Sequence, residues 1–153
     1  QKMSVFAYKK QTELNEAKEM QTKLAGISVS LKAKAGANGK LFGSVTSKEI
    51  AEKLSLKSLS LADSSREVTG VYIGDLLSWV MGRAESGDAW ITIMSNINIV
   101  AVASLADVAC IILAEGVVPD ESVLATALQK GINIYTSDKT AYQLAASLSE
   151  CLQ

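Results

Sequence analysis

The sequence predicts an α/β fold, in which a mainly parallel sheet flanked by helices follows an N-terminal helix and a small antiparallel α+β segment. Two observations predict this class. After Ser55, short apolar runs alternate with amphipathic segments, as strands alternate with helices in α/β proteins. These runs are apolar at nearly every position, which is typical of strands covered on both faces. The sheet is therefore expected to lie buried between helices.

The first third of the chain has a different pattern. Ile27, Val29 and Leu31 alternate with polar residues and predict a strand with one exposed face. Thr46 and Glu49 have the spacing of a capping box at the start of a helix. In order, we expect a polar helix over 4–25, a strand over 27–32, a turn at 36–39, an extended segment over 41–45 and a short helix over 46–54.

The remaining elements follow from the alternation of apolar and amphipathic segments. Strands are expected over 57–61, 68–73, 89–94, 108–113 and 132–136, and helices over 75–85, 97–105, 121–130 and 139–150. We expect the helix that starts at Asp75 to bury one face against the sheet and to end at Gly87. Its expected buried residues are Leu76, Leu77, Val80, Met81 and Ala84.

Charge is distributed unevenly along the chain. The 153 residues carry 15 basic and 16 acidic side chains, a net charge of −1. Residues 1–54 carry ten Lys and five Glu, whereas residues 55–153 carry five basic and eleven acidic residues. A polyanion is therefore attracted to the first third alone.

Composition excludes several classes of chemistry. The chain has no histidine, which removes histidine metal ligands and the Ser-His-Asp and Cys-His nucleophile systems. Cys110 and Cys151 are too far apart for a zinc site with Cys-x-x-Cys spacing. No constellation supports catalysis, so we expect no enzyme activity, no cofactor and no bound metal.

The longest apolar stretch, 97–114, is expected to be buried core and not a membrane span. Asn98, Ser104 and Asp107 interrupt it, and a carboxylate is costly in lipid. The low cysteine content fits a reducing compartment, so we expect a cytoplasmic protein without membrane contact.

The string KLFGSVTSKEIAEKL at 40–54, preceded by SVSLKAKAGANG at 28–39, resembles the C-terminal domain of large-subunit ribosomal protein nine. By our reading the resemblance covers the first third and stops at Leu54. It implies a long exposed helix that leads into a small α+β domain contacting ribosomal RNA. The residues expected to meet RNA are Lys32, Lys34, Lys40, Phe42 and Lys48. A solvated basic face explains the same lysines equally well.

The rest of the chain resembles the DRTGG domain. Ser65-Arg66-Glu67-Val68-Thr69-Gly70-Val71 occupies the signature, and YIGDLLSWVM, GDAWITI, NIVAVA, DVACIILAEG and TSDKTAYQLA follow it. Three departures stand within the signature: Ser65 replaces Asp, Glu67-Val68 intervenes before Thr69, and Val71 replaces the second Gly. The family occurs in regulatory regions of some phosphotransacetylases and pyrophosphatases, which implies a non-enzymatic regulatory or association module that forms a homodimer.

We interpret the chain as a fusion of residues 1–54 with a DRTGG-like domain over 55–153. Both families place a helix of the KEIAEKL type at this position, so the helix over 46–54 fits either part. An engineered chimera is our first hypothesis, because the first segment lacks the strands that complete the ribosomal domain and would expose an unpaired sheet edge. A natural fusion is the competing hypothesis.

The candidate ligand-binding residues are Arg66, Thr69, Gly70 and Asp75. A guanidinium and a hydroxyl beside a glycine are suited to hold a phosphate at the end of a strand. The ligand would be an adenine nucleotide or another phosphorylated metabolite. The alternative is that Arg66 pairs with a neighbouring acid, Thr69 stabilises the turn and Asp75 caps a helix.

Two function classes therefore stand. The first is a homodimeric, non-enzymatic module that senses a nucleotide or other anionic metabolite. The second is a ribosomal RNA-binding protein that acts through its basic N-terminal segment, for which we expect weak and salt-sensitive binding.

Overall fold

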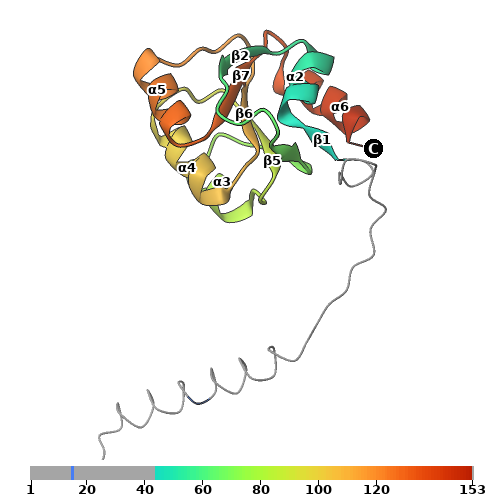
Figure 1. Cartoon of the computed structure of the whole chain (residues 1–153). Helices are drawn as coiled ribbons and strands as arrows, with labels where there is room; N and C mark the ends of the chain where they lie inside the picture. Colours follow the sequence, from blue (N-terminus) through green and yellow to red (C-terminus); the bar gives the residue numbers. More distant parts are fainter. Residues whose placement is uncertain (1–14, 16–43, 153) are drawn as a thin grey trace, which may run out of the picture. The chain divides into compact units, whose positions relative to one another are not determined.

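The computed structural model describes Asn15 and residues 44–152 (Figure 1). Asn15 has helical backbone, and the other residues of the expected helix 4–25, strand 27–32 and turn 36–39 lie outside the described residues. The strands are β1 (Val45–Thr46), β2 (Lys57–Ser60), β3 (Glu67–Val68), β4 (Gly70–Ile73), β5 (Asp88–Thr92), β6 (Cys110–Leu113) and β7 (Asn133–Thr136). The helices are α2 (Ser47–Leu54), α3 (Leu77–Arg83), α4 (Asn98–Ala106), α5 (Glu121–Gln129) and α6 (Ala141–Cys151).

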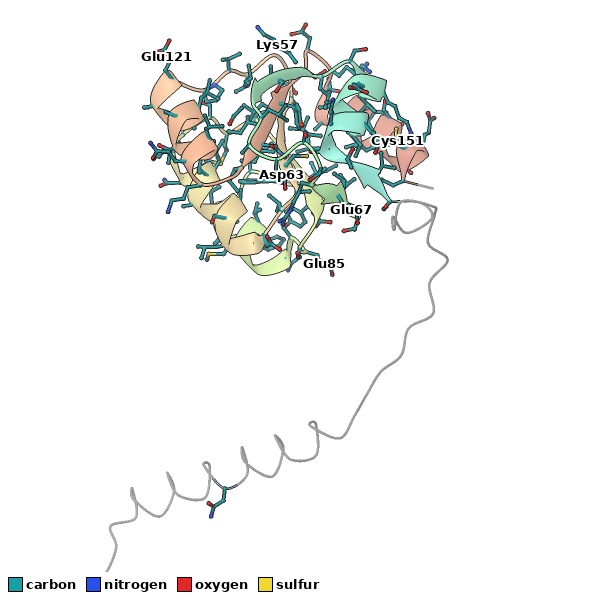
Figure 2. All side chains as sticks on the ribbon, in the orientation of Figure 1. Lys57, Asp63, Glu67, Glu85, Glu121 and Cys151 are labelled. Carbon is teal, nitrogen blue, oxygen red and sulfur yellow. The ribbon has the colours of Figure 1, made fainter. Side chains whose placement is uncertain are left out.

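Within residues 44–152, five strands form one sheet in the order β2-β7-β6-β5-β4. Strands β4 to β7 run parallel, and β2 joins β7 in the antiparallel direction with Lys57 opposite Thr136. This confirms the expected mainly parallel sheet. All parallel strands point the same way, so the molecule has an amino edge, where these strands begin, and a carboxyl edge, where they end. Figure 2 shows Glu85, just before β5, and Lys57, opposite the end of β7, at opposite ends of the domain.

Helices cover both faces of this sheet. One face carries α3, α4 and α5, and the other carries α2 and α6 (Figure 1). Successive side chains of a strand point to opposite faces, so Trp90 of β5 packs toward α3 and α4 while Ala89 and Ile91 pack toward α2 and α6. This two-sided burial explains why the strand sequences are apolar at consecutive positions.

The short helix expected after Thr46 is confirmed as α2, including its cap. Thr46 Oγ1 accepts a hydrogen bond from the Glu49 amide at 3.2 Å, and the Glu49 carboxylate accepts one from the Thr46 amide at 2.8 Å. Ile50 and Leu54 of this helix are buried in the core of the α/β domain. The helix that fits both resemblances is therefore an integral part of the domain.

The strand just before α2 is paired. Val45 and Thr46 pair antiparallel with Val68 and Glu67 of β3. The sequence led us to expect an unpaired edge where the ribosomal resemblance ends, and at β1 this expectation is wrong. A strand from within the DRTGG signature supplies the missing partner.

The helix expected over 75–85 is shorter than its pattern suggested. It runs from Leu77 to Arg83, and of the expected buried face Val80 alone is fully buried, whereas Leu76 is 61% and Met81 51% exposed. A helix of two turns presents only a narrow stripe to the sheet, and Leu76 precedes it with extended backbone. Gly87 belongs to the turn that leads into β5, where its φ is +86°.

The apolar stretch over 97–114 forms α4 and β6, as expected of buried core. Asp107 ends α4 in the left-handed conformation, with φ of 54°. In the part of the chain that the structure describes, no helix has the length and apolar character needed to cross a bilayer.

Candidate functional site

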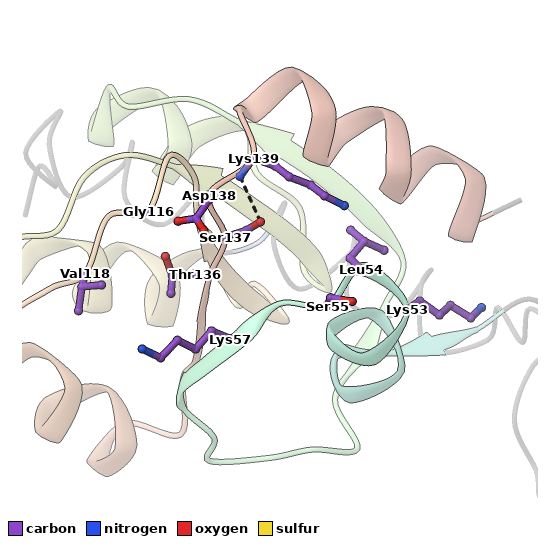
Figure 3. Close-up of a pocket in the computed structure, with 10 residues that line it drawn as sticks. All are labelled: Lys53, Leu54, Ser55, Lys57, Gly116, Val118, Thr136, Ser137, Asp138 and Lys139. Atoms are coloured by element: carbon purple, nitrogen blue, oxygen red, sulfur yellow. Dashed lines mark hydrogen bonds between the residues drawn. The ribbon is translucent and has the colours of Figure 1, made fainter.

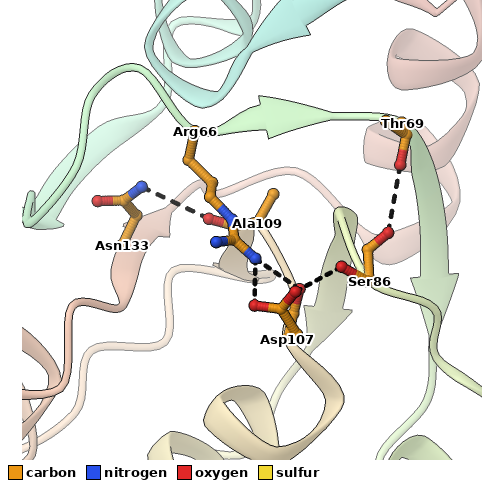
Figure 4. Close-up of polar contacts among 6 residues, drawn as sticks. All are labelled: Arg66, Thr69, Ser86, Asp107, Ala109 and Asn133. Carbon is orange, nitrogen blue, oxygen red and sulfur yellow. Dashed lines mark hydrogen bonds and ion pairs between the residues drawn. The ribbon is translucent and has the colours of Figure 1, made fainter.

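At the amino edge of the sheet, a polar cluster joins Arg66, Thr69, Ser86 and Asp107 (Figure 4). Arg66 Nη2 donates to the Asp107 carbonyl oxygen at 2.9 Å and forms an ion pair with the Asp107 carboxylate. Ser86 Oγ donates to the other carboxylate oxygen of Asp107, and Thr69 Oγ1 donates to the Ser86 carbonyl oxygen at 3.4 Å. The cluster ties together the segments that enter β3, β4, β5 and β6.

The Arg66 charge is neutralised within this cluster. The Ser86 hydroxyl, and after it the Arg66 guanidinium, hold the pKa of the Asp107 carboxyl below its usual value. Asp107 is therefore ionised at neutral pH and pairs with Arg66. The alternative interpretation expected Arg66 to pair with a neighbouring acid, and the partner found is Asp107, which is 41 residues away in the sequence.

Gly70 and Gly87 make the cluster compact. A Cβ on Gly70 would lie 2.3 Å from Asp88 Oδ1, and a Cβ on Gly87 would lie 2.5 Å from Thr69 Oγ1. The space that a side chain would need at Gly70 is occupied by Asp88, and the space at Gly87 is occupied by Thr69. The geometry at Gly70 thus has a structural explanation that needs no ligand.

Asp75 lies at the opposite edge of the sheet from the other candidates. It follows the carboxyl end of β4, and its Oδ1 accepts hydrogen bonds from Thr92 Oγ1 at 2.7 Å and from the Ile93 amide at 3.1 Å. The four residues of β4 separate it from Thr69 by roughly 13 Å at the usual rise per residue. The structure therefore brings Arg66, Thr69 and Gly70 into one region and does not bring Asp75 to it.

A cleft opens at the carboxyl edge, between the ends of β6 and β7 (Figure 3). The chain leaves β6 toward α5 on one face and leaves β7 toward α6 on the other. Adjacent strands whose connections diverge in this way leave a crevice outside their carboxyl ends, where α/β proteins bind ligands. The cavity measures 640 Å³, and its lining residues are Lys53, Leu54, Ser55, Lys57, Gly116, Val118, Thr136, Ser137, Asp138 and Lys139.

The cleft carries an excess of positive charge. Lys53 comes from the end of α2, Lys57 from the start of β2 and Lys139 from the loop after β7, and Asp138 is the one acid in the lining. Among the described residues, none of these three lysines forms an ion pair with an acid. Three lysines from separate elements therefore line one cavity, their side chains pointing in different directions (Figure 3), and none forms an ion pair within the described part of the chain.

Backbone hydrogen bonds fix the floor of the cleft. The Glu115 amide donates to the Lys139 carbonyl oxygen at 3.0 Å, and the Gly116 amide donates to the Ser137 carbonyl oxygen at 2.9 Å. Glu115 and Gly116 both have positive φ, and a Cβ on Gly116 would lie 2.9 Å from Asp138 Oδ1. The loops that follow β6 and β7 are thus joined, which preorganises the site.

None of the residues that line this cleft was among the binding residues expected from the sequence. One signal was present, because Gly116 and the Ser137-Asp138-Lys139 segment both follow predicted strands closely and so belong at a carboxyl edge. Among the expected RNA-binding residues, Lys48 lies exposed on α2 with its Nζ 4.0 Å from Glu52 Oε1. Lys32, Lys34, Lys40 and Phe42 lie outside the described residues.

Two family models match the chain. The DRTGG domain matches residues 49–151, and the ribosomal protein L9 C-terminal domain matches residues 15–70. The two matches share residues 49–70, which include most of α2 and the strands β2 and β3.

The curated relatives are similar to the first part of the chain. Large ribosomal subunit protein bL9 of Thermoanaerobacter sp. (strain X514) is 47% identical over 72 residues, which cover 43% of this chain and 49% of that protein. The bL9 protein of Ruminiclostridium cellulolyticum is 55% identical over 53 residues, covering 35% of this chain and 36% of that protein. The chain spans about half the length, or less, of these relatives.

A solved structure shares the fold of the α/β part. It is the crystal structure of the CBS and DRTGG domains of the regulatory region of Clostridium perfringens pyrophosphatase, complexed with its activator diadenosine tetraphosphate. The TM-score is 0.59 at 16% identity, over 70% of this chain and 47% of that one. The family match extends over most of the sequence, so the chain belongs to the DRTGG domain family and joins to that domain a segment that matches the C-terminal domain of ribosomal protein L9.

Proposed function

We propose that the chain is a non-catalytic regulatory module that binds an adenine nucleotide or another phosphorylated metabolite in the cleft at the ends of β6 and β7. The observation that carries the proposal is that Lys53, Lys57 and Lys139, which form no ion pair within the described part of the chain, all line one cavity whose loops are joined by backbone hydrogen bonds. Ammonium groups without carboxylate partners are available to phosphate oxygens. The regulatory pyrophosphatase region that shares this fold was crystallised with a nucleotide activator, which supports the same ligand class.

This proposal moves the ligand away from the residues of the signature. Arg66 is already paired with Asp107, and a second anion would have to displace that carboxylate. The space beside Gly70 is taken by Asp88. In contrast, the lysines of the cleft need no rearrangement of a described ion pair before they meet a phosphate.

A thermal-shift titration with ATP, ADP and diadenosine tetraphosphate tests this proposal. A ligand that binds the folded state alone stabilises it by about 2.7 kcal/mol at a hundredfold excess over its Kd. We expect the shift to vanish in the double variant Lys57→Ala, Lys139→Ala. It should persist in Lys130→Ala, a matched change of an exposed lysine at the end of α5.

Two results would contradict the proposal. If no nucleotide raises the melting temperature of the wild type, nucleotide sensing is wrong. If the shift survives the double variant but is lost in Arg66→Ala, the ligand occupies the signature region instead. Isothermal titration calorimetry on the same variants gives an independent measure of Kd.

We further propose that the module is cytoplasmic and forms a homodimer. A regulatory domain that self-associates can transmit ligand occupancy between copies, because a ligand that binds one arrangement better shifts the population toward it. The mass of the chain in solution, against 16.2 kDa for a monomer, tests this part of the proposal.

RNA binding through the basic N-terminal segment is the second candidate function. The match of residues 15–70 to the ribosomal protein L9 C-terminal domain favours it. Lys48, at the start of α2, then contributes charge but no sequence recognition. Electrophoretic mobility shifts with a ribosomal RNA fragment at rising salt test this candidate, and nanomolar binding at physiological salt would make RNA the principal ligand.

A further inference from the structure

A face of the helical layer formed by α3 and α4 is unusually apolar for an exposed surface. Six of the eleven large apolar side chains that are exposed in the described part of the chain belong to residues 76–105. They are Leu76, Trp79, Met81, Ile93, Ile97 and Leu105. We call these six residues, together with Ala101 and Ser104 between them on α4, the α3–α4 face.

The α4 part of the α3–α4 face carries no charge, and the cations beside the face are Arg83, which stacks 3.8 Å from the centroid of the Trp79 ring, and Lys130 of the α4–α5 groove. From Ala89 to Ala106 the sequence contains no charged residue, and 76–82 contains none either. The exposed side of α2 on the other face of the sheet offers a contrast, since it carries Lys48, Glu49, Glu52 and Lys53. An exposed apolar patch that is depleted of charge is typical of the core of a protein interface.

The geometry of α4 suits close contact with another helix. Between α4 and α5 lies a groove of 290 Å³. Its lining residues are Ile97, Val100, Ala101, Ser104 and Leu105 on the α4 side and Thr126 and Lys130 on the α5 side. Ala101 and Ser104 are small, so a second helix is able to approach to the 8–10 Å that packed helices adopt. Leu105, 72% exposed, lines the same groove. Helix α4 therefore offers both an exposed apolar side chain, Leu105, and one wall of a groove.

We propose that the occupant of the α3–α4 face is a second copy of this chain, packed with α4 against α4 around a twofold axis. This inference rests on the proposed self-association and assigns its surface. In a twofold contact each residue near the axis meets its own counterpart, so a charge there would face an identical charge. Helix α4, which has no charged residue, avoids that repulsion next to the axis, and each Leu105 is able to enter the partner's groove.

The area of the face is close to what a dimer needs. Six large apolar side chains, each about half exposed, offer roughly 600 Å² per copy if a large side chain presents roughly 200 Å². The smaller residues of α4 add to this value. Stable interfaces bury about 800 Å² per partner.

Sedimentation equilibrium on the wild type, Leu105→Glu and Tyr142→Glu tests the proposal. Tyr142 is the matched control, because it is a large side chain, 81% exposed, on α6 of the opposite face. We expect a dimer of twice 16.2 kDa for the wild type and for Tyr142→Glu, and a monomer for Leu105→Glu. Circular dichroism melting of each variant establishes that it is folded.

A cross-linking experiment tests the same interface without a substitution that disrupts the dimer. In a Cys151→Ser background, Ser104→Cys should form an intermolecular disulfide under mild oxidation, whereas Ser149→Cys on α6 should not. The native Cys110 does not compete, since it is fully buried and burial raises its thiol pKa to about 12.

The outcomes separate the two proposals. A wild type that stays monomeric at high concentration overturns both self-association and this interface. A wild type that dimerises while folded Leu105→Glu also dimerises, and Ser104→Cys does not cross-link, overturns the interface alone. A dimer in which Tyr142→Glu dissociates and Leu105→Glu does not would place the contact on α6.

Discussion

The two edges of the parallel sheet are built in opposite ways. At the amino edge, Arg66, Thr69, Ser86 and Asp107 satisfy one another through hydrogen bonds and an ion pair. At the carboxyl edge, Lys53, Lys57 and Lys139 surround a cavity and have no ion-pair partner among the described residues. The signature residues of the family are therefore already paired at one edge of the sheet, whereas the lysines at the other edge have no ion-pair partner among the described residues.

The largest expected loss of stability comes from a substitution at Gly87, which lies at the amino edge. Gly87→Ala forces a side chain into a left-handed backbone and places its Cβ 2.5 Å from Thr69 Oγ1. We expect the free energy of unfolding to fall by about 2–3 kcal/mol, as measured by urea denaturation.

Gly131→Ala is the matched control for Gly87→Ala. Gly131 also has a positive φ, +74°, but a Cβ there would meet no atom within 4 Å. Gly131→Ala should lower the free energy of unfolding by about 1 kcal/mol, because it introduces backbone strain without a steric clash. Equal losses in the two variants would show that the close approach to Thr69 contributes nothing.

At the carboxyl edge, the expected effect is on ligand affinity. Removing two of the three cleft lysines in Lys57→Ala, Lys139→Ala should weaken ATP binding at least tenfold, since charged hydrogen bonds to phosphate are lost. The free energy of unfolding without ligand should change by less than about 0.5 kcal/mol, because these exposed lysines form no described ion pair. Calorimetric titration and urea denaturation measure the two quantities. A large loss of stability with unchanged affinity would reverse the roles that we assign to the two edges.

The fold was predictable wherever local sequence determines the structure. Strands β5, β6 and β7 follow from continuous apolar runs, and α2 follows from the Thr46 and Glu49 capping box. The division of the segment 68–73 into β3 and β4 was not predictable, since Thr69 fits an extended strand as well as its neighbours do. The break at Thr69 exists because β3 pairs with β1, which is distant in sequence, and not with the five-stranded sheet that contains β4.

The site was much less predictable than the fold. The cleft combines the end of α2, the loop after β6 and the loop after β7, three segments that are far apart in the sequence. Their convergence depends on the face to which each connecting helix crosses, which is decided by tertiary packing. The pairing of Arg66 with Asp107 likewise spans 41 residues, so the local acids beside Arg66 gave no indication of it.

A smaller effect measures the ion pair of the amino edge directly. In a double-mutant cycle with Arg66→Ala and Asp107→Asn, we expect a coupling free energy of about 0.5–1 kcal/mol. The value is modest because the two side chains are 36% and 60% exposed, so solvent screens them. Asn is chosen at position 107 because it tolerates the left-handed backbone found there. Urea denaturation of the four proteins provides the measurement, and a coupling of zero would mean that Arg66 does not hold the edge closed.

The smallest expected effect is the pH dependence of the same edge. The Ser86 hydroxyl and the Arg66 guanidinium lower the pKa of Asp107 in the folded state relative to its ordinary value of 3.8. A depressed carboxyl pKa means that the unfolded chain binds the proton more readily, so the contribution of Asp107 is fully present above pH 3.8 and is lost as the pH falls below it. The free energy of unfolding of the wild type should therefore fall more steeply between pH 5 and about pH 2.5 than that of Asp107→Asn, which has no proton to gain at this position. Lys57→Ala is the control from the open edge and should follow the wild-type slope. Parallel slopes for the wild type and Asp107→Asn would show that the Asp107 carboxylate gains nothing from its partners, and the amino edge would then be closed by its glycines and backbone contacts instead of by charge.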